Sequence, residues 1–343
     1  MAWSRAVRAA LAGAALSLAA ATAALAGPTL DGVKSKGYVA CAVNTGLAGF
    51  SMADRQGHFT GLDVDVCRAI AAAIFGNAEK TKFVPATAQQ RFTLLQSGEV
   101  DVLTRNTTWT LQRDTELGLN FAPVNYYDGQ GFMVAKKSGV TSAKQLDGAT
   151  VCVQPGTTTE LNLADYFRSN KMGFKPLVIE KLDEVENAFF SGRCDVYTTD
   201  RSGLAATRAG KAPNPDDYVI LPEVISKEPL APAVRHGDDE WFDIVKWAVF
   251  GMFDAEEKGI TSKNVDAMLK SDDPEVKRML GVTPGMGAAL HLDEKWLYNI
   301  IKLVGNYGES FDRNVGKDSP LKLERGLNAL WTQGGLIYGM PIR

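Results

Sequence analysis

The stretch Asp101-Val-Leu-Thr-Arg-Asn-Thr-Thr-Trp-Thr-Leu-Gln-Arg113 begins as an apolar strand and ends in hydroxyl groups and a guanidinium. Its first half continues the apolar pattern that follows the loop signal Ser97-Gly98. A strand that opens into polar groups at the carboxyl edge of an α/β sheet is a typical place to bind a small anion. The planar guanidinium of Arg113 can donate two parallel hydrogen bonds to a carboxylate, which an ammonium group cannot do. An ordinary surface arginine that follows a loop is the alternative, and the pattern alone favours carboxylate binding and this alternative about equally.

The first 26 residues have the features of a secretory signal peptide. Arg5 and Arg8 form a charged start, residues 9–25 form an apolar run, and Ala24-Leu25-Ala26 is a small-residue cleavage site. The apolar run is shorter than a bilayer requires, which argues against the alternative of an uncleaved membrane anchor. We therefore expect an exported, soluble protein that begins at Gly27.

The charge balance of the expected mature chain is acidic. Loss of the two arginines leaves 35 of the 37 basic residues against 40 acidic ones, a formal net charge of −5. Binding to nucleic acid requires a basic face that neutralises phosphates. The composition therefore argues against nucleic acid as a partner.

The cysteines and histidines give no metal-binding pattern. An even number of cysteines in an exported chain favours disulfides, and four cysteines allow three pairings. The spacing never gives a CxxC motif, and the three histidines lie far apart, so we expect no zinc site. These residues are Cys41, Cys67, Cys152 and Cys194, and His58, His236 and His291.

Two halves of the chain share a similar plan. Residues 39–46 resemble residues 150–156, and residues 94–103 resemble residues 188–197. Strands and helices alternate in both halves, which predicts an α/β protein with a mainly parallel sheet in each of two lobes. We expect strands over residues 38–43, 83–85, 100–103, 131–135, 150–153, 175–179, 194–198, 219–221 and 231–234. We expect helices over residues 62–75, 91–96, 142–146, 161–167, 184–190, 241–253 and 265–269, and helical patterns in the tail at 297–304 and 323–330.

Three further features could bind an ion: a pair of aspartates at a helix start, a loop between a strand and a helix, and an aspartate at a strand end. Asp63 and Asp65 lie in the first turn of an expected helix, where carboxylates complement the helix dipole more simply than they bind a metal. The loop at residues 154–160 joins a strand to a helix with the geometry of an anion site, but it lacks the Gly-Lys-Ser/Thr of a nucleotide loop, so a plain turn is the alternative. Asp200 ends a strand, where it either complements Arg113 or caps a helix.

These motifs together resemble the periplasmic amino-acid-binding proteins of ABC importers, the family of the glutamine- and histidine-binding proteins. The resemblance covers about residues 38–260, and each motif alone is weak. It rests on Gly61-Leu-Asp-Val-Asp65, residues 101–113, Phe121-Ala-Pro123, Leu146 to Val151 entering Pro155-Gly-Thr157, and Cys194-Asp-Val196 before Asp200. The start at residues 29–34, the segment Arg105 to Thr110 and the long tail are similar to the branch that binds L-amino acids generally.

The resemblance implies a ligand held between two lobes. The α-carboxylate is expected on Arg113, with help from Thr108 and from the backbone amide of Thr158. The α-ammonium is expected on Asp200, with the backbone carbonyl of Asn106 as a second acceptor.

The resemblance also places Asn44 and Leu47 at the pocket for the ligand side chain. Asn44 stands where the glutamine-binding relative has an acid, and Gln154 stands where it has a lysine. Neutral walls suit broad specificity, because strict specificity needs buried groups that the wrong ligand leaves unpaired. No cofactor is expected.

The resemblance implies the type II periplasmic-binding-protein fold with two chain crossings and a helical C-terminal extension. We expect lobe 1 at residues 27–130 and 228–280, lobe 2 at residues 131–227, and the extension at residues 281–343 packed on a lobe. The hinge would lie in crossings near residues 126–131 and 225–232. Since disulfides between lobes would prevent hinge motion, we predict the pairs Cys41–Cys67 and Cys152–Cys194. The expected partners are L-amino acids and an inner-membrane ABC permease, with the protein a periplasmic monomer.

Three alternatives stay open at this point. An exported enzyme on the same scaffold, such as a dehydratase, would need an acid or base in the cleft, for which Asp200 and Glu160 are the candidates. Asp200 is better explained by the ligand ammonium, and Glu160 by the dipole of the helix that it begins. A binder of one specific amino acid is the second alternative. A sensory ligand-binding domain is the third, although such domains normally continue into a membrane segment.

Overall fold

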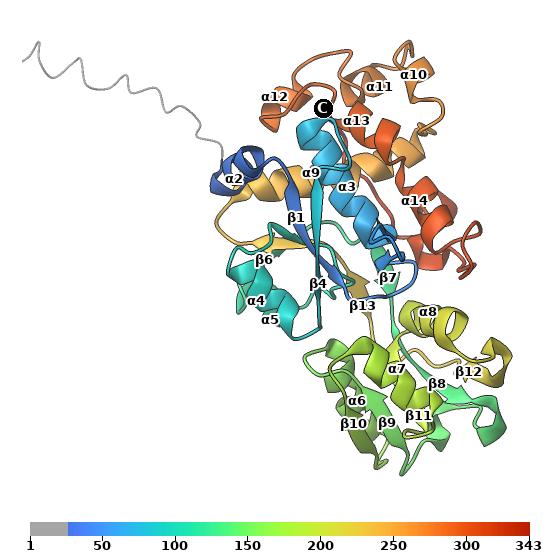
Figure 1. Cartoon of the computed structure of the whole chain (residues 1–343). Coiled ribbons are helices and arrows are strands. Elements are labelled where there is room, and N and C mark those ends of the chain that lie inside the picture. The colour runs from blue at the N-terminus through green and yellow to red at the C-terminus, as the bar shows by residue number, and fades with distance from the viewer. Residues whose placement is uncertain (1–26) are drawn as a thin grey trace, which may run out of the picture.

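The computed structural model describes residues 27–343, so the predicted signal peptide lies outside the described residues. Two lobes, each built on a five-stranded sheet, lie one above the other and are joined by extended segments (Figure 1). The expected two-lobed α/β fold is therefore present.

Lobe 1 contains a sheet in the order β4-β1-β5-β14-β6. β1 pairs in parallel with β4 and β5, whereas β14 pairs antiparallel with β5 and β6. Its strands are β1 (Val39–Asn44), β4 (Thr81–Ala86), β5 (Val102–Leu103), β6 (Leu119–Phe121) and β14 (Ala233–Arg235). Its helices are α2 (Pro28–Lys36), α3 (Leu62–Phe75), α4 (Gln90–Gln96), α5 (Leu111–Thr115) and α9 (Asp239–Glu257), and a small hairpin joins β2 (Met52–Ala53) to β3 (Phe59–Thr60).

Lobe 2 contains a sheet in the order β10-β9-β11-β8-β12. Its strands are β8 (Gln130–Ala135), β9 (Thr150–Val153), β10 (Lys175–Val178), β11 (Val196–Asp200) and β12 (Tyr218–Ile220). Its helices are α6 (Thr158–Ser169), α7 (Leu182–Phe190) and α8 (Arg201–Lys211), with short 3-10 turns η1 (Lys136–Ser138), η2 (Ala143–Gln145) and η3 (Pro215–Asp217). Both sheets are mixed rather than mainly parallel, because β14 and β8, which adjoin the crossings, enter their sheets antiparallel.

Two short strands form the crossing between the lobes. β7 (Tyr126–Asp128) pairs antiparallel with β13 (Glu228–Leu230), and each lies in one of the segments expected to form the hinge. Narrow crossings of this kind are the elements that absorb hinge motion in two-lobed proteins.

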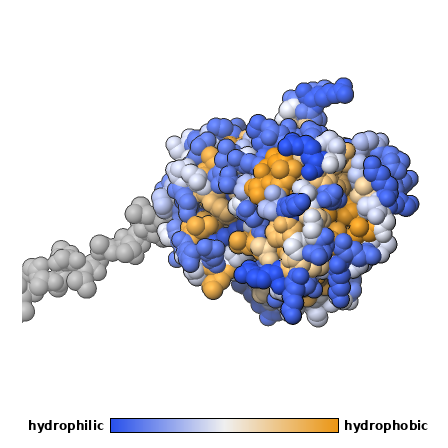
Figure 2. All heavy atoms as spheres, turned by 90° about the horizontal axis from the view of Figure 1, so that it is seen from below, coloured by the Kyte–Doolittle hydropathy of each residue, from blue (hydrophilic) through white to orange (hydrophobic). Residues whose placement is uncertain are grey.

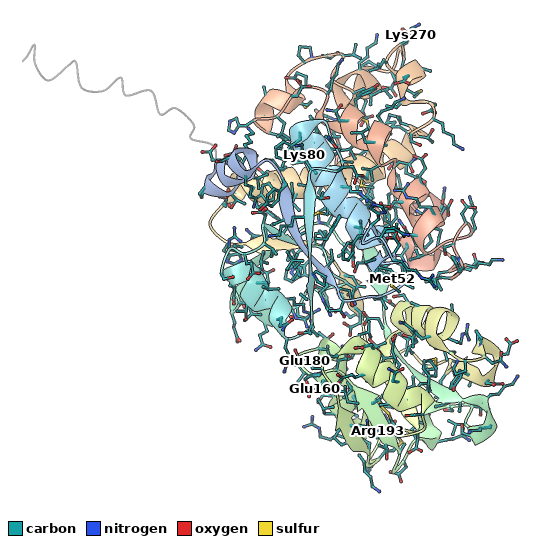
Figure 3. The ribbon with its side chains drawn as sticks, in the orientation of Figure 1. Met52, Lys80, Glu160, Glu180, Arg193 and Lys270 are labelled. Atoms are coloured by element: carbon teal, nitrogen blue, oxygen red, sulfur yellow. A yellow bond between two sulfur atoms is a disulfide. The ribbon has the colours of Figure 1, made fainter. Side chains whose placement is uncertain are left out.

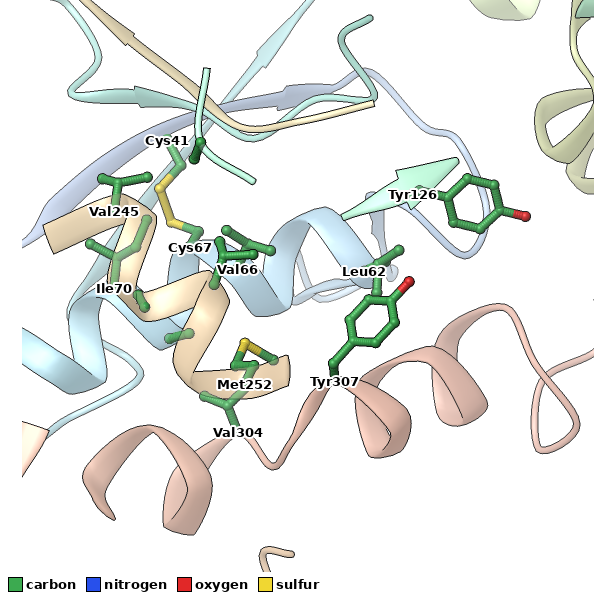
Figure 4. Close-up of a cluster of buried hydrophobic side chains, with 14 of the residues drawn as sticks. Cys41, Leu62, Val66, Cys67, Ile70, Tyr126, Val245, Met252, Val304 and Tyr307 are labelled. Atoms are coloured by element: carbon green, nitrogen blue, oxygen red, sulfur yellow. A yellow bond between two sulfur atoms is a disulfide. The ribbon is translucent and has the colours of Figure 1, made fainter. Parts of the chain in front are cut away.

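The core of lobe 1 is continuous with the C-terminal extension. The Cys41–Cys67 disulfide joins β1 to α3, and the buried Val245 and Met252 of α9 belong to the same apolar cluster (Figure 4). Helix α3 begins directly after Gly61, whose φ of 138° and close approach to the Phe50 carbonyl exclude any side chain. Helix α3 packs beside β1, so the motif from Gly61 to Asp65, which contains the first turn of the helix, has a packing role.

The C-terminal extension covers lobe 1. Helix α13 packs against α3 and α9, and α14 packs against the same two helices. The residues 323–330, predicted as helical, form only the short turn η4, so that expectation is wrong; Arg325 instead packs over Phe311. The end of lobe 1 contains α10 (Val265–Met268) and α11 (Pro274–Met279). The extension contains α12 (Met286–Ala289), α13 (Trp296–Leu303), α14 (Tyr307–Asn314), η4 (Gly326–Asn328) and η5 (Trp331–Gln333).

The surface of lobe 2 is mainly hydrophilic. Seen from the end of the molecule that this lobe forms, hydrophilic residues surround separate hydrophobic areas (Figure 2). Within residues 27–343, every helix is too short or too polar to cross a bilayer.

The second disulfide, Cys152–Cys194, lies within lobe 2, so both predicted disulfide pairs are present.

Candidate functional site

A polar cavity, here called the central cavity, lies between the two lobes. Lobe 1 contributes Asn44, Ala88, Arg91, Arg105, Asn106 and Thr108, and lobe 2 contributes Gln154, Thr157, Thr158, Thr159, Thr199 and Asp200. Five of the seven residues predicted to bind ligand therefore meet here. Leu47 is different: it is buried in the apolar cluster of lobe 1 and is not among the residues that line the cavity.

Arg113 lies at the edge of this cavity. It lines an adjoining outer cleft, which shares Ala88, Thr157 and Thr158 with the central cavity. Its Nη1 donates a hydrogen bond of 2.8 Å to the Thr108 carbonyl, and its guanidinium carbon lies 5.1 Å from the centre of the Phe92 ring. Arg113 is thus held in place by groups that leave most of its donors free.

The local sequence explains why Arg113 points into the interior. Thr110 caps helix α5, and its hydroxyl accepts a hydrogen bond from the backbone amide of Arg113. The side chain is buried, and burial lowers the pKa of Arg113 to about 10, an effect opposed by the charges of Glu228 and Asp200. Arg113 therefore remains a cation at neutral pH and is only partly screened by water.

Asp200 is a buried carboxylate at the carboxyl end of β11. It precedes α8, yet its side chain makes no capping hydrogen bond, so the alternative of a capping aspartate is wrong. Burial raises the pKa of Asp200, and the nearby charges of Asp128 and Glu228 raise it further, whereas a hydrogen bond from Asn106 lowers it. A carboxylate in this environment is stabilised by an added cation.

Asn106 is held in an unusual backbone conformation by Asp63. Its φ is 20°, and its amide donates a hydrogen bond of 2.9 Å to the Asp63 carboxylate. The Nδ2 of Asn44 donates to the Oδ1 of Asn106 at 3.1 Å, which orients both amides at the cavity. Burial raises the pKa of Asp63 to about 7.

The second acid of that pair has a different contact. Asp65 accepts hydrogen bonds from Ser310, Arg313 and Asn314 of the C-terminal extension. Both acids lie in the first turn of α3, as expected from the sequence, and both also have specific hydrogen-bond partners. No cluster of metal-ligating side chains occurs within residues 27–343.

The glycine-threonine loop of lobe 2 presents the start of α6 to the cavity. Thr157 caps the helix by accepting from the Glu160 amide, and Thr158 is the first helical residue. Free amides at a helix start favour an anion. Glu160 accepts from the Gly156 amide at 3.0 Å, and it lies with Glu180 where lobe 2 faces lobe 1 (Figure 3).

Three charged residues at the site were not predicted from the sequence. Arg91 and Arg105 line the central cavity, and Glu228 lies beside it. Arg91 is almost fully buried, and its Nε has no hydrogen-bond partner among residues 27–343. Burial lowers its pKa, and the charges of Arg113 and Arg105 lower it further. A signal for Arg91 was available: it lies four residues before Leu95, on the buried face of α4.

Comparison with known proteins identifies the family. Residues 39–267 match the bacterial extracellular solute-binding proteins, family 3. The chain belongs to this family. The general L-amino acid-binding periplasmic protein AapJ of Rhizobium johnstonii is 57% identical over 328 residues, which are 95% of this chain and 96% of the relative. The glutamate/glutamine/aspartate/asparagine-binding protein BztA of Rhodobacter capsulatus is 54% identical over 316 residues, 92% of this chain and 93% of the relative.

A solved structure of a family member has the same fold. The ABC transporter periplasmic binding protein from Brucella ovis, with glutathione bound, superposes with a TM-score of 0.90 at 58% identity, covering 92% of this chain and 99% of that one. The expected type II fold and the expected membership of the periplasmic amino-acid-binding proteins of ABC importers are both confirmed. Most of the C-terminal extension is shared, since the match covers 92% of this chain.

Proposed function

We propose that this protein captures L-amino acids between its two lobes in the periplasm and delivers them to an ABC permease in the inner membrane. The observation that carries the proposal is the position of two buried charged residues on opposite lobes: the carboxylate of Asp200 lines the central cavity, and the guanidinium of Arg113 lines the outer cleft that adjoins it. Membership of family 3 and the similarity to the amino-acid-binding proteins AapJ and BztA support it.

The shared zwitterion explains binding of many amino acids by one site. The α-carboxylate pairs with the free guanidinium donors of Arg113 and with the Thr158 amide at the start of α6. The α-ammonium pairs with Asp200 and the Asn106 carbonyl. Because every α-amino acid has this head group, these contacts do not depend on the side chain.

The other walls of the central cavity set the preference among side chains. Asn44 and Gln154 are neutral amides that donate and accept hydrogen bonds. Arg91 and Arg105 are cations, and among residues 27–343 the Nε of Arg91 has no hydrogen-bond partner. We expect acidic and amide side chains to bind well, in agreement with the name of BztA. Glutathione, bound in the Brucella ovis protein, is a further candidate because its γ-glutamyl group carries a free amino-acid head.

The remaining expectations follow from the same proposal. Residues 1–26 are removed before Gly27 on export, and the mature protein acts as a periplasmic monomer. The sheet to which each strand belongs supports lobe 1 at residues 27–130 and 228–280, lobe 2 at residues 131–227, and an extension at residues 281–343 that packs on lobe 1.

A thermal-shift survey tests the proposal. The mature protein is unfolded to release bound ligand, refolded, and heated with each of the twenty L-amino acids, with glutathione, and with D-amino acids as controls. A ligand at a hundred times its Kd adds about 2.7 kcal/mol of stability. We expect shifts with many L-amino acids and the largest with acidic and amide ones. A shift with only one would establish a specific binder, and no shift with any would refute the amino-acid assignment.

A further inference from the structure

Glu228 lies at the point where the second crossing passes the central cavity. It is the first residue of β13, it is 1% exposed, and it pairs in register with Asp128 of β7. The polar stretch of lobe 1 runs beside it, since the Trp109 amide donates to the Pro229 carbonyl at 2.9 Å. A carboxylate on the hinge strand is thereby placed next to both lobes.

The two carboxylate oxygens of Glu228 accept four hydrogen bonds. Oε2 accepts from the Thr108 hydroxyl at 2.6 Å and from the Thr158 hydroxyl at 2.8 Å. Oε1 accepts from the Asn162 amide at 2.8 Å and from the Ser226 hydroxyl at 2.5 Å. Thr108 belongs to lobe 1, whereas Thr158 and Asn162 belong to lobe 2. One oxygen atom therefore joins the two lobes.

We infer that Glu228 is a positioning residue that stabilises the closed arrangement of the lobes before ligand binds. Its contacts with Thr108, Thr158 and Asn162 are here called the Glu228 bridge. The bridge uses the hydroxyl groups of both threonines, so the ligand carboxylate is left with Arg113 and the Thr158 backbone amide. The part of this inference that concerns ligand rests on the proposed function, whereas the part that concerns closure does not.

The chemistry of a carboxylate suits this role. An ionised carboxylate only accepts hydrogen bonds and has about four lone-pair sites, which the three contacts of the bridge and the hydrogen bond from Ser226 occupy. When the lobes separate, the contacts of one lobe are exchanged for contacts with water, so the net cost of opening is moderate. The bridge therefore shifts the balance between open and closed forms without locking the protein closed.

The bridge affects ligand binding through the fraction of protein that is closed before ligand arrives. The apparent Kd of a ligand that requires the closed form is its intrinsic Kd divided by the fraction of closed protein. Loss of the bridge should lower that fraction and let bound ligand leave faster. The effect should be similar for all amino acids, because the bridge does not contact the ligand side chain.

Three variants test the bridge. Glu228→Ala removes it, Glu228→Gln keeps one oxygen that can accept from both threonines, and Thr158→Val removes only the hydroxyl from lobe 2. Small-angle X-ray scattering of the ligand-free proteins measures the fraction of open form, and stopped-flow fluorescence measures ligand dissociation. Thermal unfolding establishes that each variant is folded.

We expect Glu228→Ala to have a larger radius of gyration without ligand and dissociation at least five-fold faster. Thr158→Val should lie between Glu228→Ala and the wild type, and Glu228→Gln should stay close to the wild type. Glu184→Ala is the control: it removes an exposed contact within lobe 2, from the Lys181 ammonium at 2.8 Å, leaves every hydrogen bond of the bridge intact, and should change little.

Wild-type scattering and dissociation in a folded Glu228→Ala or Thr158→Val protein would overturn the inference. An effect of Glu228→Gln as large as that of Glu228→Ala would also contradict it, because an acceptor oxygen remains. If neither the wild type nor the variants bind amino acids, the proposed function is refuted. The scattering of the ligand-free proteins would still test the bridge, because that measurement needs no ligand.

Discussion

The side-chain amide of Asn328 hydrogen-bonds both backbone groups of Tyr127. Its Oδ1 accepts from the Tyr127 amide at 2.6 Å, and its Nδ2 donates to the Tyr127 carbonyl at 3.1 Å. Tyr127 lies in β7 opposite Pro229, which has no amide hydrogen to offer. Tyr307 adds a second contact by donating to the Asn125 carbonyl at 2.8 Å. The C-terminal extension thus completes the edge of the crossing strand.

Replacing Asn328 with alanine should lower the free energy of unfolding by about 1–3 kcal/mol, because two backbone groups of β7 lose their partner. Urea unfolding measures the change. Asn170→Ala is the matched control, since that exposed amide bonds only the nearby Tyr166 carbonyl, and it should cost less than about 0.5 kcal/mol. Equal losses of stability from the two substitutions would show that the C-terminal extension does not stabilise the crossing strand through Asn328.

Removing either disulfide should reduce stability without changing ligand affinity. The Cys41–Cys67 and Cys152–Cys194 bonds span 26 and 42 residues within single lobes. Loop-closure entropy predicts a loss of about 3–4 kcal/mol for each double-alanine variant. Urea unfolding and calorimetry on the folded variants measure both quantities. A non-reducing peptide map that finds any pair between lobes would contradict the assignment.

Asp254 should make stability depend on pH. It lies in α9, its Oδ2 has no hydrogen-bond partner among residues 27–343, and burial raises its pKa to about 7. The folded protein therefore binds more protons than the unfolded chain between about pH 4 and pH 7, so the free energy of unfolding falls as pH rises through that window. Asp254→Asn should gain on the order of 1–3 kcal/mol at pH 8 and little at pH 4.

The exposed Asp266 gives the control for that experiment. A hydrogen bond from Lys302 lowers the pKa of Asp266, so its contribution is present at high pH and is lost on acidification. Asp266→Asn should therefore be neutral or slightly destabilising at pH 8. A stabilising effect of both substitutions at pH 8 would mean that net charge, rather than burial of Asp254, is responsible.

Amino-acid binding should release protons through Asp200. Burial raises the pKa of Asp200 in the ligand-free protein, whereas the ligand ammonium favours its ionised form. Affinity should therefore weaken as pH falls from 8 to 5. Calorimetry at pH 6 in two buffers with different ionisation enthalpies counts the protons. A count of zero from pH 5 to pH 8 would show that the ligand does not use Asp200, and Asp200→Asn should abolish both the protons and most of the affinity.

Much of the fold could be predicted because its periodic elements are strong. Helix α3 matches the expected residues 62–75, and β1, β8 and β9 fall within one residue of their expected positions. The missed elements are short or contain poor helix formers: α5 has five residues, and α8 contains two glycines. Helix and turn in the tail could not be distinguished, because Leu323, Leu327 and Leu330 repeat at helical spacing although only η4 forms.

The site residues that belong to recognisable sequence motifs could be predicted. Those that reach the site only through the folding of distant segments could not. Asn44 and Asp200 end strands, Thr158 begins a helix, and Asn106 and Thr108 lie in the loop that follows β5; the fold brings such positions to one edge. Glu228 had no such signal. It precedes a proline in an extended segment, and only its pairing with β7 places its carboxylate between the two threonines. A charged residue that meets its partners from distant segments can be assigned to the site only when the structure is known.

The most direct test of the central claim is calorimetry of Arg113→Ala with a set of chemically different L-amino acids. Arg168→Ala, an exposed arginine on α6, is the control. If Arg113 binds the carboxylate that all these ligands share, every affinity should fall by about 2–5 kcal/mol, roughly thirty- to several-thousand-fold, and by a similar factor for each. Unchanged binding in Arg113→Ala, or losses confined to ligands with one kind of side chain, would contradict recognition of the common head group by this residue.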